Sequence, residues 1–124
     1  MERSTPEVPT RMLTDDGKII HFRKIDIGSW DMDATASKNV NHPLGAKYLN
    51  VLFIDAWILS DNLAVKTPLY RVWDGVDPTL LGGGIYEITA GEVVLYRRAG
   101  GFYDSLDYNL AAINRGYVVI CYHD

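Results

Sequence analysis

The fold of this chain is decided by residues 100–124, GGFYDSLDYNLAAINRGYVVICYHD. A glycine pair opens this stretch, a connection rich in aromatic residues and aspartate follows, and residues 117–122 form an apolar run. β-Branched and aromatic residues favour strands, and a run that is apolar at consecutive positions indicates burial on both faces. We therefore expect a strand at 117–122, covered on one face by an opposing sheet and on the other by residues 105–113 or by another subunit.

The connection at residues 105–113 has weak helical character. Ser105 is a type of residue that caps helices, and Leu106, Leu110 and Ile113 recur at helical spacing. This pattern predicts one or two helical turns within 105–113, with an irregular loop as the alternative.

Short strand-like segments upstream alternate with turn signals. The predicted strands lie at residues 18–27, 30–33, 47–59, 69–73, 85–89 and 92–98. Residues 34–45 are polar and are predicted to include a loop, and a tight hairpin is expected around Ala90 and Gly91. Because strands do not alternate with helices, the sequence predicts an all-β fold, an antiparallel β-sandwich or jelly-roll-like fold of about seven to eight strands.

Residues 47–59, KYLNVLFIDAWIL, form the most apolar segment of the chain. Apolar residues at both alternating sets of positions favour a central strand that is buried on both faces. Asp55 interrupts this segment, and a buried carboxylate is costly unless it is paired or hydrogen-bonded. We therefore expect either a bulge near Asp55 or a basic partner such as an arginine.

The length and composition favour one domain. A chain of 124 residues with 48% apolar residues can bury one core of ordinary size, and we place this β-sandwich domain at residues 18–124. Residues 1–17 contain Pro6 and Pro9 and few apolar side chains, which predicts an extended N-terminal arm. The arm is either disordered or an anchor that becomes ordered on a neighbouring protein.

Charge and cysteine content exclude several classes of protein. The net charge of −4 argues against a nucleic-acid partner, because such a surface has to neutralise phosphates. Cys121 is the only cysteine, so we expect neither an intrachain disulfide nor a cysteine-based zinc site, as is usual in a reducing cytosol. No apolar run approaches the roughly 20 residues that span a membrane, and no signal peptide is visible, so we expect no membrane insertion.

The sequence contains no pattern that indicates catalysis. Its three histidines are far apart, and its carboxylate pairs lack the spacing of a calcium-binding loop. These pairs are Asp31 and Asp33, Asp74 and Asp77, and Asp104 and Asp107. Ser105 is not within a nucleophile motif, and Cys121 lies in an apolar strand where a thiol is usually inert. We expect no enzymatic activity, no cofactor and no metal.

Aromatic and polar residues gather in one segment that could form a ligand site or a subunit interface. The candidates are Phe102, Tyr103, Asp104, Asp107, Tyr108, Asn109 and Arg115. Sugar sites combine an aromatic ring with polar groups, and tyrosine is also enriched at interfaces, so both interpretations stay open. We expect the two aspartates to accept hydrogen bonds from local backbone donors or from Arg115.

Four segments stand out in this order: GSWDMDAT at residues 28–35, VNHPL at 40–44, GGFYDS at 100–105 and NRGYVVI at 114–120. Together they resemble a small all-β module of tailed-bacteriophage virion proteins such as tail fibres, head fibres and similar appendages. The resemblance implies a non-enzymatic structural or host-attachment protein of the virion, usually a homo-oligomer, which assembles with other virion proteins in the host cytoplasm. The resemblance identifies no catalytic residue in this chain.

The resemblance spans residues 24–122 but is weaker at residues 46–66, and Pro43 stands where the pattern has a glycine. A surface built from that region is therefore not implied by the resemblance. Two other hypotheses are kept, a lectin-like domain that binds a glycan receptor and a small cytosolic enzyme. The enzyme hypothesis predicts a deep pocket with converging titratable groups.

Overall fold

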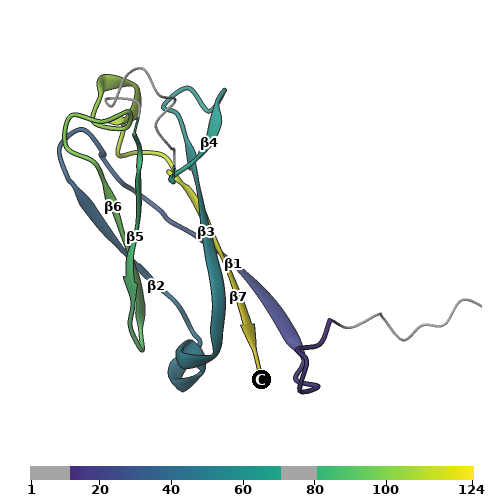
Figure 1. Cartoon of the computed structure of the whole chain (residues 1–124). Coiled ribbons are helices and arrows are strands. Elements are labelled where there is room, and N and C mark those ends of the chain that lie inside the picture. The colour runs from purple at the N-terminus through teal and green to yellow at the C-terminus, as the bar shows by residue number, and fades with distance from the viewer. Residues whose placement is uncertain (1–11, 71–80) are drawn as a thin grey trace, which may run out of the picture.

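The chain folds into two antiparallel sheets that pack as two layers, shown side by side in Figure 1. The computed structural model describes residues 12–70 and 81–124. Its strands are β1 (Ile20–Asp26), β2 (Ser37–Asn41), β3 (Val51–Leu59), β4 (Lys66–Pro68), β5 (Gly83–Ile88), β6 (Glu92–Arg97) and β7 (Gly116–His123). The strand orders are β1-β7-β3-β4 and β2-β6-β5, which confirms the predicted all-β sandwich. Among the described residues, no helix has the length and apolar character that crossing a membrane requires.

Strand β7 is one of the two inner strands of the larger sheet, where it pairs with β1 and β3. Val118 lies between Ile25 and Ala56 in the register, and its side chain is fully buried against the other sheet, as is that of Ile120. Val93 of β6 contributes to the same core from the opposite layer. The predicted strand at residues 117–122 is therefore confirmed, and its inward side chains hold the two layers together.

The outward face of β7 is not covered by the connection at residues 105–113. This connection contains only the short 3₁₀ helix η3 (Leu106–Tyr108), which lies at one end of the sandwich, away from the second 3₁₀ helix η1 (Gly45–Asn50). Ser105 caps η3 as predicted, because its hydroxyl accepts a hydrogen bond from the Asp107 amide. The expectation that this segment covers β7 is wrong, and a covering subunit stays a prediction.

Strand β3 is buried on one face only, so the expectation of two buried faces is wrong. Ala56 and Ile58 point into the core, whereas the alternate residues Phe53 and Asp55 are exposed. Asp55 needs no buried partner because its carboxylate is on the solvent side. The register does shift in β3, between Val51 and Phe53.

Two segments before β3 differ from the prediction. Residues 37–41 form the edge strand β2 within the predicted loop, since Val40 pairs with Val93 and is buried. Residues 30–33 form no strand, although Trp30 and Met32 are buried as the alternating pattern indicated.

The second sheet contains the predicted hairpin. Strands β5 and β6 pair through Ile88 and Val93, on either side of the turn that includes Gly91. A bulge separates Ile85 from Glu87 in β5, and β6 ends one residue before the predicted boundary. Local pairing across a short turn explains why this part could be predicted from sequence.

The N-terminal arm is described only from Met12. There the chain folds back, because the Ile20 amide donates to the Met12 carbonyl and Leu13 forms a bridge with Ile19. A short strand was predicted at residues 69–73, whereas the structure has the strand β4 just before it, and Leu69 and Tyr70 are not part of a strand. The rest of the arm, residues 71–73 and the aspartate pair Asp74 and Asp77 lie outside the described residues.

Candidate functional site

Arg115 lies at the start of β7 and ties several segments together at one end of the sandwich. Its guanidinium is fully buried. Nε donates to the Trp30 carbonyl at 3.0 Å, Nη1 to the Leu59 carbonyl at 2.8 Å and Nη2 to the Leu110 carbonyl at 2.7 Å. Nη2 also contacts the Asp61 carboxylate at 2.9 Å. A planar group with five N–H donors suits this role, because it reaches these four acceptors in different segments at once.

Asp61, in the loop after β3, is the charged partner of Arg115. Its carboxylate also accepts hydrogen bonds from the backbone amides of Asn109 at 3.2 Å and Leu110 at 3.0 Å. Partial burial opposes ionisation, but the hydrogen bonds from the Leu110 amide and the Arg115 guanidinium prevail and hold the pKa of Asp61 below its ordinary value. Asp61 is thus a charged support for the connection that follows η3.

A second buried arginine, Arg97 of β6, holds the irregular segment at residues 30–33. Its Nε donates to the Met32 carbonyl at 2.5 Å, and Nη2 to the Asp33 carbonyl at 3.3 Å. The carboxylate of Asp104 lies 3.5 Å from Nη2 and also accepts a hydrogen bond from the Gly100 amide at 2.8 Å. Asp104 therefore accepts the hydrogen bond that was expected from a local backbone amide. The basic partner of Asp104 is Arg97 rather than Arg115, which pairs with Asp61.

The predicted aromatic residues form a packed cluster. Phe102, Tyr103 and Tyr108 contact one another with ring centroids 4.9 to 5.6 Å apart. Tyr103 is fully buried, its hydroxyl lies 2.6 Å from the Thr67 hydroxyl, and it donates to the Pro68 carbonyl at 2.6 Å. Buried rings of this kind stabilise the fold, and Tyr103 offers no open ring surface to a sugar.

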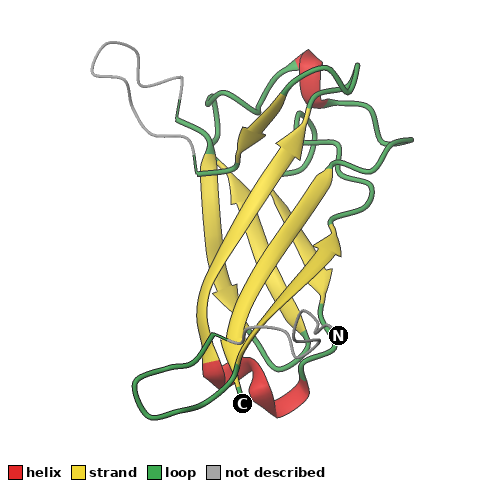
Figure 2. Ribbon diagram, turned by 90° about the vertical axis from the view of Figure 1, so that its right-hand side faces the viewer, coloured by secondary structure: helices red, strands yellow, loops and turns green. Residues whose placement is uncertain are grey.

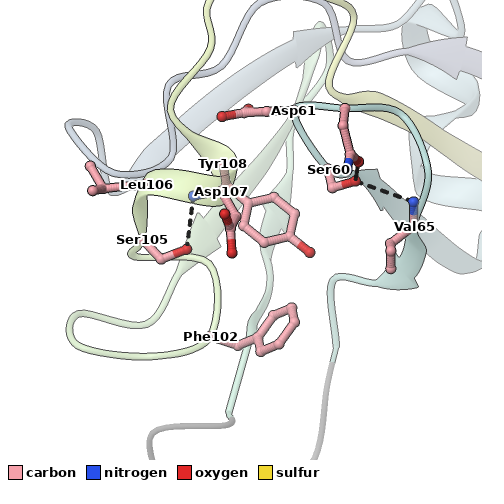
Figure 3. A pocket seen from close by; sticks show the side chains of 9 residues that line it. Ser60, Asp61, Val65, Phe102, Ser105, Leu106, Asp107 and Tyr108 are labelled. Carbon is pink, nitrogen blue, oxygen red and sulfur yellow. Dashed lines mark hydrogen bonds between the residues drawn. The ribbon is translucent and has the colours of Figure 1, made fainter.

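A groove of about 480 Å³ lies beside this cluster (Figure 3). Its described lining consists of Ser60, Asp61, Asn62, Val65, Phe102, Ser105, Leu106, Asp107 and Tyr108. The predicted residues Phe102, Asp107 and Tyr108 are among them, whereas Tyr103, Asp104, Asn109 and Arg115 are not. Residues 60–62 were predicted only as a turn, and nothing in the sequence indicates that this turn meets residues 102–108.

Some polar groups of the groove already have partners. The Ser60 hydroxyl donates to Asn62 Oδ1 at 2.7 Å and accepts a hydrogen bond from the Val65 amide. The Ser105 hydroxyl accepts from the Asp107 amide at 3.3 Å. Serine hydroxyls held in this way are turn and cap elements rather than activated nucleophiles.

The outward side of the larger sheet carries aromatic and charged residues in register. Figure 2 views the molecule from the side of this sheet, with strands rather than helices along most of its length. We call this surface the aromatic face. It consists of Phe22, Lys24 and Asp26 of β1, Tyr117, Val119 and Cys121 of β7, and Phe53, Asp55 and Trp57 of β3. Phe22 is 54% exposed and Phe53 49% exposed.

Neighbouring side chains cover parts of the aromatic face. The rings of Phe22 and Phe53 pack edge to face with centroids 6.4 Å apart, in the same row as Cys121. Cys121 is only 2% exposed, and burial raises the pKa of its thiol. Lys24 Nζ lies 4.5 Å from the centre of the Tyr117 ring, which is a favourable cation–π contact.

Lys66 of β4 extends the same surface. Its ammonium lies 5.2 Å from the centre of the Trp57 ring and donates to the Tyr117 hydroxyl at 2.9 Å. The aromatic face therefore combines aromatic rings, cations and carboxylates. The outward side of the other sheet differs: it carries Tyr86 and Tyr96 among the polar residues Ser37, Asn39, Asn41, Glu87 and Glu92.

The described residues contain no group of three or more histidine, cysteine, aspartate or glutamate side chains that could hold a metal ion. Comparisons of the chain with protein-family models, with curated proteins and with solved structures found no match.

Proposed function

We propose that this chain is a non-enzymatic structural module of a bacteriophage particle, which assembles with other virion proteins and uses the aromatic face to contact a neighbouring subunit. The observation that carries the proposal is the pair of half-exposed rings, Phe22 and Phe53, on a sheet surface that also contains Trp57 and Tyr117. Contiguous exposed aromatic surface is characteristic of protein interfaces, where aromatic residues are enriched.

The residues that carry the phage resemblance are also those that hold this scaffold. The Gly28 amide donates to Asn114 Oδ1 at 2.8 Å, the Arg115 amide donates to the Gly28 carbonyl, and the Met32 amide donates to the Tyr108 carbonyl. Segments 28–35 and 114–120 are thus joined directly. This supports the proposal because these residues form backbone contacts within the scaffold, which suits a structural role.

The state of the candidate nucleophiles also supports a non-enzymatic role. The Ser105 hydroxyl serves as the cap of η3, and the Cys121 thiol is buried with a raised pKa, which disfavours the reactive thiolate. Asp61, in the groove, is neutralised by Arg115. None of these three groups is arranged as a nucleophile with an adjacent base.

The test replaces the two exposed rings by charges in the double variant Phe22→Lys, Phe53→Lys. We expect this variant to fold but to be incorporated poorly when the other virion proteins assemble in its presence. Tyr86→Lys, which is exposed on the other sheet, is the matched control and should be incorporated normally. Normal incorporation of the folded double variant would contradict the proposal.

The N-terminal arm is a second point of attachment in this proposal. Deletion of residues 1–11 leaves the fold-back at Met12 and Leu13 intact and is expected to lower incorporation into particles. Equal incorporation of the full and shortened chains, measured on purified particles, would show that the arm is not an anchor.

A lectin-like role is the second candidate, and the groove in Figure 3 favours it. The Phe102 ring and the Asp107 carboxylate both line the groove, and a ring with a nearby polar group is the combination that sugar sites use. A glycan array with the intact chain tests this role. Binding that is lost in Phe102→Ala and Asp107→Ala but kept in Asn109→Ala, outside the groove, would support it, and no binding to any glycan would exclude it.

A further inference from the structure

We infer that the partner of the aromatic face is a second copy of this chain, bound face to face in a symmetric dimer. This inference rests on the proposed function in that it names the partner of the same face. An interface between two identical faces is isologous, so each contact between residues i and j occurs twice. The face must therefore be complementary to itself, and the order of its residues can be checked for this property.

The charges of the aromatic face are placed on opposite sides of β7. One row consists of Lys24 on β1, Val119 on β7 and Asp55 on β3. With neighbouring strands about 4.8 Å apart, Lys24 and Asp55 are about 10 Å from each other across Val119. At this distance the two side chains do not form a close pair within one chain: Asp55 is exposed, and the Lys24 ammonium lies over the Tyr117 ring on the surface of the face.

A two-fold axis that runs parallel to β7, between two stacked faces, matches these charges. This rotation exchanges the two sides of β7 and keeps each row in place. Lys24 of each copy then faces Asp55 of the other, and Phe22 faces Phe53. In the next row, Asp26 of each copy faces Trp57 of the other copy. The Lys66 ammonium lies over that Trp57 ring, so Asp26 faces a positive charge there. Opposite charges thus meet at two places, Lys24 with Asp55 and Asp26 with Lys66, and the phenylalanine rings meet each other.

The alternative axis, perpendicular to β7 within the interface, gives the opposite result. It keeps β1 over β1 and β3 over β3, and when it passes through the row of Lys24 and Asp55, Lys24 faces Lys24 of the other copy and Asp55 faces Asp55. Like charges placed directly across an interface are strongly unfavourable. Between two axes that pass through the row of Lys24 and Asp55, the charges therefore favour the one parallel to β7, which is also compatible with the aligned packing of two twisted sheets.

The size of the face sets the conditions under which the dimer is observable. Four strands about 4.8 Å apart, with seven residues in β1 rising about 3.3 Å each, give a face of about 19 Å by 23 Å. Two such faces bury about 870 Å² in total, which is below the roughly 1,200 Å² of standard specific interfaces and in the range of weak, transient contacts. Sedimentation therefore has to extend to a protein concentration of about 1 mM, well above a micromolar dissociation constant.

The experiment is a charge exchange followed by analytical ultracentrifugation. In Lys24→Glu alone, the new glutamate faces Asp55 of the other copy twice, and in Asp55→Lys alone the new lysine faces Lys24 twice. Each single variant is expected to weaken the dimer at least about tenfold. An equimolar mixture of the two variants places a glutamate against a lysine and an aspartate against a lysine, so it should form a one-to-one heterodimer.

The controls separate this inference from the proposed function and from misfolding. Asn39→Lys, on the outward side of β2, should dimerise like the unmodified chain, and circular dichroism checks that each variant is folded. An unmodified chain that stays monomeric up to about 1 mM, or a mixture that forms no heterodimer, would overturn the inference. If such a monomer still needs Phe22 and Phe53 for incorporation into particles, the proposed function stands without the dimer.

Discussion

Arg115 and Asp61 form an ion pair of 2.9 Å in which the guanidinium has no exposed surface. A buried charge without compensation is costly, and here three backbone carbonyls and one carboxylate accept from the same arginine. The pair joins the loop after β3 to the start of β7, and Asp61 additionally holds the amides of Asn109 and Leu110. One end of the sandwich thus depends on a polar network rather than on apolar packing alone.

Removal of the carboxylate is expected to destabilise the fold strongly. In Asp61→Ala the Arg115 charge stays buried without its counterion, and two backbone amides lose their acceptor, so the free energy of unfolding should fall by about 3 kcal/mol. Urea unfolding followed by tryptophan fluorescence measures this change. Asp107→Ala, in the same region but exposed, is the control and should change the free energy by less than about 0.5 kcal/mol.

The contribution of Asp61 to stability is expected to disappear in acid. Its pKa in the folded chain lies below the value of about 4 for an unfolded chain, so the unfolded state binds the proton more readily. The stabilisation is therefore complete above about pH 4 and is lost as the pH falls through the lower, folded pKa. Urea midpoints of the unmodified chain and of Asp61→Ala should differ at pH 7 and approach each other toward pH 3. A constant difference over this range would contradict the assignment.

The fold class and the local hairpin could be predicted because they depend on short-range patterns. Alternating residues and turn signals identify β5 and β6, since the two strands pair across a few residues. Strand β2 escaped prediction because four of its five residues are polar and only Val40 reaches the core. The exposure of Phe22 in β1 and of Phe53 in β3 was not predicted for the opposite reason: apolar character alone does not distinguish a core face from an exposed aromatic surface.

The candidate site was predicted only in the part that lies within one segment. Residues 102–108 stand together in the sequence, whereas the other side of the groove comes from residues 60–62. Arg115 was selected as a candidate, but its contact with the Trp30 carbonyl spans 85 positions along the chain. Such contacts follow from the packing of the sheets, which no local pattern encodes. The same contacts explain why Trp30 is buried without forming a strand.

Gly116 is expected to tolerate no side chain. Its φ of +147° is unfavourable for other residues, and a Cβ at this position would lie 1.9 Å from the Trp57 carbonyl oxygen in the paired strand. Gly116→Ala should therefore lower the free energy of unfolding by about 3 kcal/mol or more, or prevent folding. Gly91→Ala is the control, because a Cβ there meets nothing within 4 Å. Similar thermal midpoints of the two variants would contradict this explanation.

The reactivity of Cys121 reports whether Phe22 and Phe53 cover it as the structure shows. In a folded monomer the thiol is 2% exposed and burial raises its pKa, so a thiol reagent at pH 8 should react slowly. Phe22→Ala removes one of the two flanking rings and is expected to raise the labelling rate at least about tenfold. The measurement is made in the Lys24→Glu background, so that dimer formation does not protect the thiol. Tyr86→Ala, on the other sheet, should leave the rate unchanged; an equal rise in both variants would indicate general opening of the fold rather than loss of the cover over Cys121.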